Sequence, residues 1–339
     1  MKKDKFNLIT IKIELNTKNI IKLFFIILIF VLLLNLEIIY LNHHKINYNN
    51  NFRISLDKFE VNIFNKIKDN LAKVKCSRMW SNQRQFLNGA VRKCKPKKVL
   101  EVGVAEGGSS IIILNAIQDI NNSHLFSIDL SSHYKVGSCV KNFFPQFLNK
   151  WSLYKGNVAA KFMEEIGNDI DMVFIDSAHY EPGEILDFLI VLPFLKEGAL
   201  VGFHDIGNQI TTAGPPNSRS EWAPYIIFNI LRGKKYLPSG KDKILTHDIG
   251  FVELEKNQFL YYHDYFRALG GQWQYFPDEK DLTLIRELFE KYYDEECLIM
   301  FDETVKFNRI FVKNNPMKTR YKFDSISVYN EKRFSENKI

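Results

Sequence analysis

The chain has 339 residues, enough for one large domain or two small ones, and its 46% hydrophobic and 25% charged residues are ordinary for a folded protein. The formal net charge of +7 is concentrated at the ends, because residues 1–22 carry +4 and residues 305–339 carry +6. The body between them is slightly acidic, which argues against a general nucleic-acid-binding protein. The four cysteines form no CxxC pair, so we expect reduced thiols and neither a zinc site nor a disulfide framework.

A strongly apolar segment, residues 20–41, follows a basic N-terminal tail, residues 1–19. Apart from Lys22, Asn35 and Glu37 it is apolar, and it is long enough to cross a bilayer core of about 30 Å. No small-residue cleavage site follows it, so the sequence predicts an uncleaved single-pass transmembrane helix with the lipid bilayer as a partner. The excess of lysines before the segment places the C-terminal body on the non-cytoplasmic side.

The next segment, residues 42–78, combines a polar linker with a helix. Leu56, Ile63, Ile67 and Leu71 recur at helical spacing, which predicts a stalk or packing helix. A second helical stretch follows at about 79–92 and leads into the main domain.

From Lys97 onward, apolar runs alternate with helical patterns. Strands are predicted at 97–103, 124–129, 152–155, 171–176, 198–204 and 249–254, and helices at 107–119, 158–166, 182–196 and 221–232. This alternation predicts an α/β domain over residues 79–255, with a doubly wound, mostly parallel sheet covered on both faces. An aromatic-rich helical extension (256–312) and a basic tail (313–339), which could rest on anionic lipid head groups, complete the chain.

Polar residues at the predicted strand ends mark a ligand site, since ligands of doubly wound sheets lie beyond the carboxyl ends of the strands. The first strand ends in "EVGVAEGG", where Glu101, Gly103 and Gly107 form G-x-x-x-G. This differs from the G-x-G-x-x-G of dinucleotide-binding folds and from G-K-[ST], which disfavours a dehydrogenase or a nucleotide-sugar enzyme. Asp129, after the second strand, could hold a ribose or cap a helix, and Asn157 could flank a purine ring.

Four motifs together resemble a known family: "VLEVGVAEGGSS", "LFSIDLS", "GNV" and "FIDSAHYEPGEILDFLIVLPFLKEGALVGFHD". Over residues 85–255 they resemble class I S-adenosylmethionine (SAM)-dependent methyltransferases, in particular the small-molecule and sugar O-methyltransferases that read F-I-D-x-x-H-x-Y and H-D. In this chain the tyrosine, Tyr180, follows the histidine directly. The resemblance implies a Rossmann-like methyltransferase fold with SAM as cofactor. By this resemblance, Glu101, Gly103 and Gly107 would hold the methionine part of SAM. Asp129 would hold its ribose, and Asn157 would lie near its adenine.

The substrate side would lie at the ends of the fourth and fifth strands. Asp176 and Asp205 are two carboxylates that could bind Mg²⁺ and orient an acceptor hydroxyl. Metal-dependent relatives have a third Asp or Asn ligand directly after the second carboxylate. That position is Ile206 here, with Asn208 two residues further on, so the metal stays open. His179 is the candidate general base, with Asp176 as its catalytic neighbour.

Other aromatic and histidine side chains near these motifs have less specific roles. Tyr180 and Trp222 could line the substrate pocket or belong to the core, and His204 is expected to be structural.

The leading hypothesis is therefore a membrane-anchored, SAM-dependent enzyme that methylates the hydroxyl of a small molecule or a glycan. The alternative is a membrane-anchored protein that kept the SAM fold for binding or scaffolding and lost catalysis. SAM is made in the cytosol, in conflict with the orientation that the N-terminal lysines favour, so the side of the membrane stays open.

Overall fold

The computed structural model describes residues 56–77, 79–207, 222–239 and 248–314. The predicted transmembrane helix 20–41 and the tail 1–19 lie outside these ranges, as does the C-terminal tail from residue 315. Within the described ranges, no helix is both long and apolar enough to cross a bilayer.

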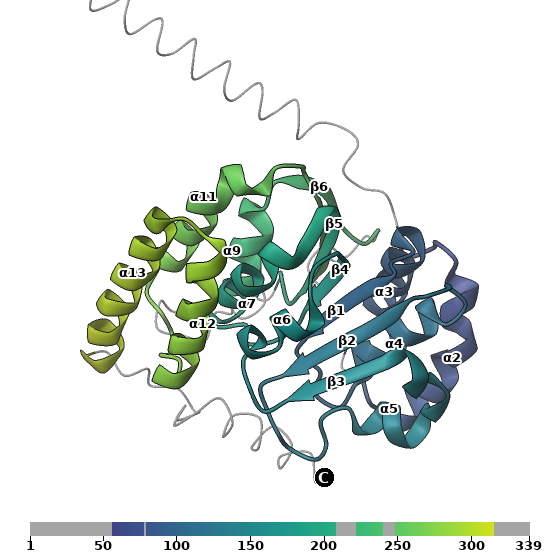
Figure 1. Ribbon diagram of the computed structural model, residues 1–339. Helices are drawn as coiled ribbons and strands as arrows, with labels where there is room; N and C mark the ends of the chain where they lie inside the picture. The colour runs from purple at the N-terminus through teal and green to yellow at the C-terminus, as the bar shows by residue number, and fades with distance from the viewer. Residues whose placement is uncertain (1–55, 78, 208–221, 240–247, 315–339) are drawn as a thin grey trace, which may run out of the picture. The chain divides into compact units, whose positions relative to one another are not determined.

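A seven-stranded sheet forms the centre of the described body (Figure 1). The strands are β1 (Lys98–Val102), β2 (His124–Asp129), β3 (Trp151–Lys155), β4 (Ile170–Ile175), β5 (Leu195–His204), β6 (Gly233–Tyr236) and β7 (Ile249–Leu254). Their order is β3-β2-β1-β4-β5-β7-β6. The first five run parallel, and β7 pairs antiparallel with both β5 and β6, so the predicted mostly parallel α/β sheet is confirmed.

Side chains of the central strands alternate between two apolar cores, one on each face of the sheet. In β4, Met172 and Phe174 belong to one core, and Val173 and Ile175 to the other, all four being 0% exposed. Burial on both faces explains why these strands read as continuous apolar runs in the sequence.

Helices cover both faces of the sheet (Figure 1). The first core is packed by α2 (Val61–Val74), α3 (Ser81–Cys94), α4 (Gly108–Ile117) and α5 (Ser138–Phe143). The second is packed by α6 (Met163–Ile166), α7 (Gly183–Val191), α9 (Ala223–Ile230), α11 (Tyr262–Arg267), α12 (Glu279–Tyr292) and α13 (Glu295–Asn314).

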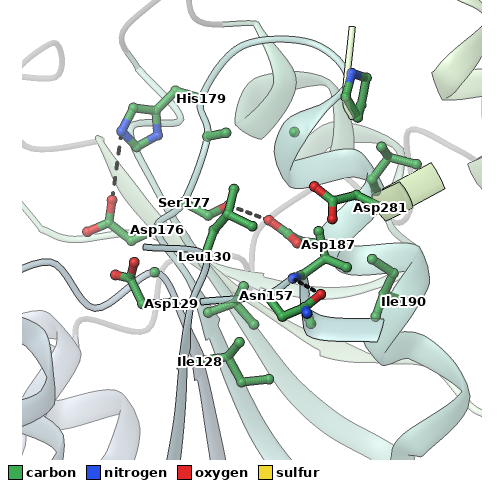
Figure 2. Close-up of a pocket in the computed structure, with 18 of the residues that line it drawn as sticks. Ile128, Asp129, Leu130, Asn157, Asp176, Ser177, His179, Asp187, Ile190 and Asp281 are labelled. Carbon is green, nitrogen blue, oxygen red and sulfur yellow. Dashed lines mark hydrogen bonds and ion pairs between the residues drawn. The ribbon is translucent and has the colours of Figure 1, made fainter. Parts of the chain in front are cut away.

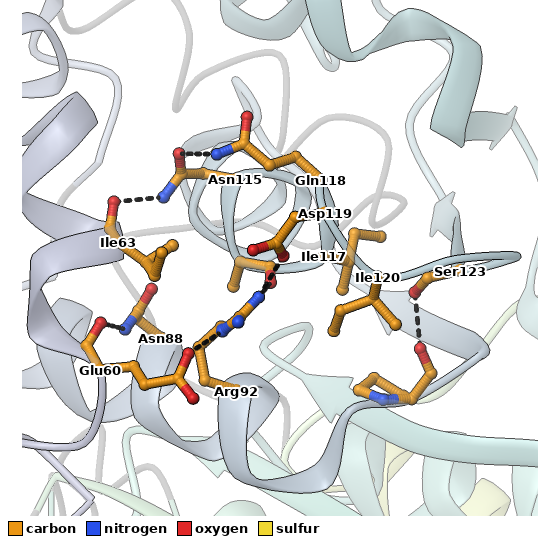
Figure 3. Close-up of polar contacts among 12 residues, drawn as sticks. Glu60, Ile63, Asn88, Arg92, Asn115, Ile117, Gln118, Asp119, Ile120 and Ser123 are labelled. Atoms are coloured by element: carbon orange, nitrogen blue, oxygen red, sulfur yellow. Dashed lines mark hydrogen bonds and ion pairs between the residues drawn. The ribbon is translucent and has the colours of Figure 1, made fainter.

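The helix expected within 42–78 is α2, and polar contacts as well as apolar packing join it to the domain (Figure 3). The buried guanidinium of Arg92 on α3 pairs with Glu60, just before α2, and with Asp119, just after α4. The amides of Asn88 and Asn115 donate to the backbone carbonyls of Glu60 and Ile63, respectively. These contacts make α2 part of the folded body.

The C-terminal extension shares the core of the second face. Phe266, Phe289 and Tyr293 pack edge to face, with ring centroids 4.8–5.2 Å apart. The Tyr293 hydroxyl also donates to the carbonyl of Leu189 on α7 at 2.5 Å. The extension is thus built onto α7, the helix that follows the fourth strand.

The structure corrects one expectation about the cysteines, because Cys76 and Cys139 form a disulfide while Cys94 and Cys297 are free. The bonded pair is separated by 63 residues and follows no spacing motif, so the sequence alone could not reveal it. The bond ties the segment before α3 to the start of α5.

Candidate active site

Two cavities lie next to each other at the carboxyl ends of the parallel strands, and both are lined by Gly103, Val104, Ala105 and Asp176. The first cavity extends toward α7 and the C-terminal extension; the side chains that characterise it are Asp129, Asn157, His179, Asp187, Tyr275 and Asp281. The second cavity extends toward the start of α3; its polar side chains include Ser77, Gln83, Glu106, His204, Asp205 and Asp248.

The loop after β1 forms the wall between the two cavities. Gly103 has a φ of +91°, and a Cβ on it would lie 2.0 Å from the carbonyl oxygen of Asp176, so only glycine fits there. Gly107 has a φ of +97° and directly precedes α4. The two glycines therefore let the loop turn sharply while lying against the end of β4. Gly103 borders both cavities, whereas Gly107 borders neither.

Glu101 supports this loop from behind. Its side chain is 0% exposed, and its carboxylate oxygens accept hydrogen bonds of 2.6 Å from the hydroxyls of Ser109, Ser110 and Ser127. Burial raises the pKa of the Glu101 carboxyl to about 7. Because the serines surround it, Glu101 lines neither cavity, and the structure does not bring it to the position expected for a direct contact with the methionine part.

Asp129 ends β2 and faces the first cavity. One carboxylate oxygen accepts the backbone N–H groups of Val104 and Ala105 at 3.0 and 2.9 Å, and the other accepts that of Ser131 at 2.8 Å. Asp129 thus holds the loop in place. The side chain also borders the first cavity, so a ligand there lies within its reach.

Asn157, after β3, also borders the first cavity, and its side-chain oxygen accepts the N–H of Val158 at 3.1 Å. Figure 2 shows His179, Asp176 and Asp129 on one side of the view and Asn157, Asp187 and Asp281 on the other, with Leu130 and Ser177 between the two groups.

His179 is buried and lies among three carboxylates. Its Nε2 lies 2.9 Å from a carboxylate oxygen of Asp205 and 3.9 Å from one of Asp176, and its Nδ1 lies 2.9 Å from Glu184. Burial alone would lower the pKa of His179, but the charges of Asp205 and Glu184 outweigh it and raise the pKa well above 6.5. The predicted site residues Asp176, His179 and Asp205 therefore meet in space.

Asp205 reaches this group from a backbone conformation that L-residues seldom adopt, with a φ of +57°. Its other carboxylate oxygen lies 3.1 Å from Nδ1 of His204. Burial opposes ionisation of Asp205, but the two imidazoles prevail and hold its pKa well below the ordinary value.

Three further residues of the site carried no sequence motif. Glu184 is fully buried on α7, and burial raises its pKa to about 7. Asp248 precedes β7 and accepts the N–H of Gly207 at 2.9 Å. Gln83 on α3 is 1% exposed, and its Nε2 has no hydrogen-bond partner among the described residues. Only the H-x-x-x-x-E spacing from His179 could have suggested Glu184.

Of the residues expected to surround these groups, His204 borders the second cavity and Tyr180 the first. Trp222 is 41% exposed and borders neither.

Asp176, His179 and Asp205 each offer one ligand atom within 4.8 Å of the others, and so do His204, Asp205 and Asp248. Carboxylate oxygens suit Mg²⁺, whereas the position of the family's third ligand is the buried, apolar Ile206. Asn208 lies outside the described residues. Asp176 and Asp205 could thus hold a divalent cation. The third donor near them is the imidazole of His179, and not the Asp or Asn side chain that the metal-dependent relatives have.

Comparison with known proteins gives a family match over the centre of this site. Residues 100–206 match the family model described as a methyltransferase domain. No curated protein matches the chain.

Several solved structures resemble the fold at low identity. The O-methyltransferase TomG from Streptomyces achromogenes, in complex with SAM, is 15% identical, with a TM-score of 0.43 over 57% of this chain and 89% of its own. The O-methyltransferase from Bacillus cereus, in complex with S-adenosylhomocysteine (SAH), is 14% identical, with a TM-score of 0.42 over 57% and 90%. The SAH-bound methyltransferase PaMTH1 from Podospora anserina is 14% identical, with a TM-score of 0.41 over 65% and 96%.

The matched segment runs from β1 through the glycine loop and the strand-end carboxylates to Ile206, and so contains the wall shared by the two cavities. This segment of the chain therefore matches a methyltransferase domain, and it contains strands β2, β3, β4 and β5 of the sheet.

Proposed function

We propose that this protein transfers the methyl group of SAM to a hydroxyl of a small molecule or a glycan. The observation that carries the proposal is the meeting of Asp176, His179 and Asp205 next to the glycine loop. Asp176 borders both cavities, so a cofactor whose nucleoside lies in the first and whose methionine part reaches the second would meet an acceptor in the second cavity at this point.

The first cavity suits the nucleoside of SAM. Asp129 would accept the ribose hydroxyls, and Asn157 would lie near the adenine. Gly103 allows the ligand to approach the backbone, and the methionine part would follow the loop toward Ser109, which borders the second cavity. The sulfonium methyl group would then lie near Asp176. Gly107 and Glu101 would act indirectly, by shaping and supporting the loop.

In this proposal, His179 removes the acceptor proton. In the neutral form of His179, Nδ1–H would be donated to Glu184, and Nε2 would take a proton from a hydroxyl held beside Asp205 and Asp176. Because the carboxylates raise the pKa of His179, this form requires a positive charge nearby, such as the sulfonium of SAM or a bound cation. As the proton passes to Nε2, the acceptor oxygen forms a bond to the methyl carbon and the carbon–sulfur bond breaks, which releases neutral SAH. The main requirement on the protein is to hold oxygen, carbon and sulfur in line.

A divalent cation would fit this scheme through Asp176 and Asp205. When bound, it would orient the acceptor hydroxyl and lower its pKa. Its positive charge would also favour the neutral form of His179, whose pKa the carboxylates otherwise raise. Dialysis against EDTA followed by addition of Mg²⁺ tests this point: restored activity supports the cation, and unchanged activity after chelation contradicts it.

Methyl transfer can be measured with the full-length protein, SAM labelled in the methyl group, and hydroxylated acceptors from glycan, lipid-linked and small-molecule extracts. We expect label in an alkali-stable ether product that depends on the protein. Binding of SAM without transfer to any fraction would instead indicate a protein that kept the fold and lost catalysis.

We further propose that residues 20–41 anchor the protein in a membrane as a single-pass helix, on the basis of their length and apolar composition. The disulfide of the body supports the non-cytoplasmic side that the N-terminal lysines favour, because disulfides persist in oxidising compartments. Protease protection in sealed vesicles tests both ideas. A protected body supports this orientation, a digested body contradicts it, and recovery of the protein in the soluble fraction excludes the anchor.

A further inference from the structure

The C-terminal extension forms part of the wall of the first cavity. Tyr275, Pro277, Asp281 and Ile285 border the cavity there, and all four lie outside the segment 100–206 that matches the family model. This part of the wall is therefore a feature of this chain that the family match does not explain.

Asp281 is a carboxylate on the wall of the cavity. It lies in the first turn of α12 and is 6% exposed, yet within the described residues its carboxylate makes no hydrogen bond or ion pair. Burial raises the pKa of its carboxyl, so its present surroundings oppose ionisation. Because Asp281 borders the cavity, its carboxylate is available to accept a hydrogen bond from a group bound there.

The neighbouring carboxylate, Asp187 on α7, is different because it already has a partner. It accepts a hydrogen bond of 2.5 Å from the hydroxyl of Ser177. Burial and the charges of Asp187, Glu184 and Asp281 all raise the pKa of the Tyr275 phenol, so these carboxylates lie around one aromatic side chain. In Figure 2 the Asp281 carboxylate is directed toward the side of the cavity where Asp187 and Asn157 lie.

The position of Asp281 relative to Asp176 and Asp129 indicates which part of SAM would lie near it. If the methyl group lies at Asp176 and the ribose at Asp129, as proposed above, the base extends beyond Asp129 toward Asn157 and Asp281. Apolar faces for a flat ring are present there, since Ile190 and Ile285 are 1% and 2% exposed and border the cavity. At the edge of an adenine, the 6-amino group is a hydrogen-bond donor that a carboxylate can accept.

We infer that the C-terminal extension recognises the adenine of SAM, with Asp281 accepting a hydrogen bond from the 6-amino group. This inference rests on the proposed function, because it requires SAM in the first cavity. It makes the extension a part of the cofactor site, and it makes Asp281 a residue that determines specificity for adenine.

Calorimetry on the full-length protein, with SAH and with S-inosylhomocysteine, tests the inference. The analogue carries a carbonyl oxygen in place of the 6-amino group, so it offers an acceptor to Asp281 instead of a donor. We expect the wild-type protein to bind SAH about 10- to 100-fold more tightly than the analogue, the range of a hydrogen bond to a charged group. In Asp281→Ala, SAH binding should weaken and the preference should fall to within about threefold.

Two further variants separate this role from a structural one. Glu287→Ala removes an exposed carboxylate from the same helix and should keep the full preference. Asp281→Asn has nearly the same shape as aspartate and covers the case in which Asp281→Ala fails to fold; it should reduce the preference as well. If Asp281 only stabilised the N-terminus of α12, its variants would lower the melting temperature and leave the preference unchanged.

The failure of this inference can be told apart from that of the proposed function. Tight SAH binding with an equal preference in wild type and Asp281 variants would overturn the adenine contact alone. No binding of SAH to the wild-type protein would overturn the proposed function and this inference together.

Discussion

At the scale of single residues, the environment of His179 argues for a chemical role. It is 6% exposed and lies between Glu184 on one side of the ring and Asp205 on the other. A histidine that only filled space would not need two carboxylates. If it is the general base, His179→Gln should lower kcat by about 10²–10⁴-fold, measured as label transferred from SAM.

The matched control for this variant is His263→Gln, which changes a histidine on α11 that borders neither cavity. It should leave kcat unchanged. SAH affinity should stay within a few-fold of wild type in both variants. Full activity in His179→Gln would rule out its role as the base.

Glu101 predicts a dependence of stability on pH. Burial raises its pKa to about 7 in the folded protein, above the ordinary 4.5 of a glutamate, so the folded state binds the proton more tightly than the unfolded state. Its contribution to stability is then fully present below pH 4.5 and is lost as the pH rises through 7. The shift corresponds to about 3 kcal/mol at most.

Urea unfolding at pH 5 and pH 8 measures this contribution. In Glu101→Gln, which cannot ionise, the difference in unfolding free energy between the two pH values should shrink by about that amount. An unchanged difference would show that Glu101 does not titrate in this range.

At the scale of elements, the contacts of α2 indicate that the segment before β1 belongs to the folded body. Arg92 holds Glu60 and Asp119, and it also donates to the carbonyl of Ala116 at 2.8 Å (Figure 3). Arg92→Leu leaves both carboxylates without their partner. Because these carboxylates are partly exposed, we expect a loss of about 1–3 kcal/mol in the free energy of unfolding, measured by denaturant titration.

Lys68→Ala changes an exposed cation on α2 and serves as the control, with an expected effect within about 0.5 kcal/mol. Equal stability of Arg92→Leu and wild type would mean that the network contributes little.

The elements also show what could be read from the sequence. The six predicted strands are all present, because strands buried on both faces leave continuous apolar runs. The edge strand β6, with the sequence GKKY, was missed because its two lysines break that pattern. Its place in the sheet comes from pairing with β7.

Only part of the candidate site could be predicted from the sequence. The glycine loop and the carboxylates at strand ends occupy fixed places in a parallel sheet, so Gly103, Asp129, Asp176 and Asp205 could be named from spacing. Other residues reach the site from helices and loops through tertiary packing, which no local pattern records. These residues are Gln83, Glu184, Asp248 and Asp281.

At the scale of the whole molecule, the disulfide joins two parts of the body next to the site. Cys76 borders the second cavity, and the backbone N–H of Cys139 donates to the carbonyl of Glu106 in the glycine loop at 2.9 Å. A bond that closes a loop of this length stabilises a protein by about 2–4 kcal/mol, mainly by restricting the unfolded chain.

Cys76→Ser should therefore lower the free energy of unfolding by about 2–4 kcal/mol under non-reducing conditions. The control is Cys94→Ser, which removes a free cysteine. The addition of a reductant should destabilise the wild type and leave Cys76→Ser unchanged. Equal sensitivity of both proteins to the reductant would show that the bond does not form in solution.

The central claim is that the first cavity binds SAM, and titration calorimetry of the full-length protein with SAH and with NAD tests it most directly. We expect one SAH site per chain and no heat from NAD, and Asp129→Ala should weaken SAH binding by at least about tenfold through the loss of the ribose contact. The absence of SAH binding, or SAH affinity unchanged in Asp129→Ala, would contradict the account.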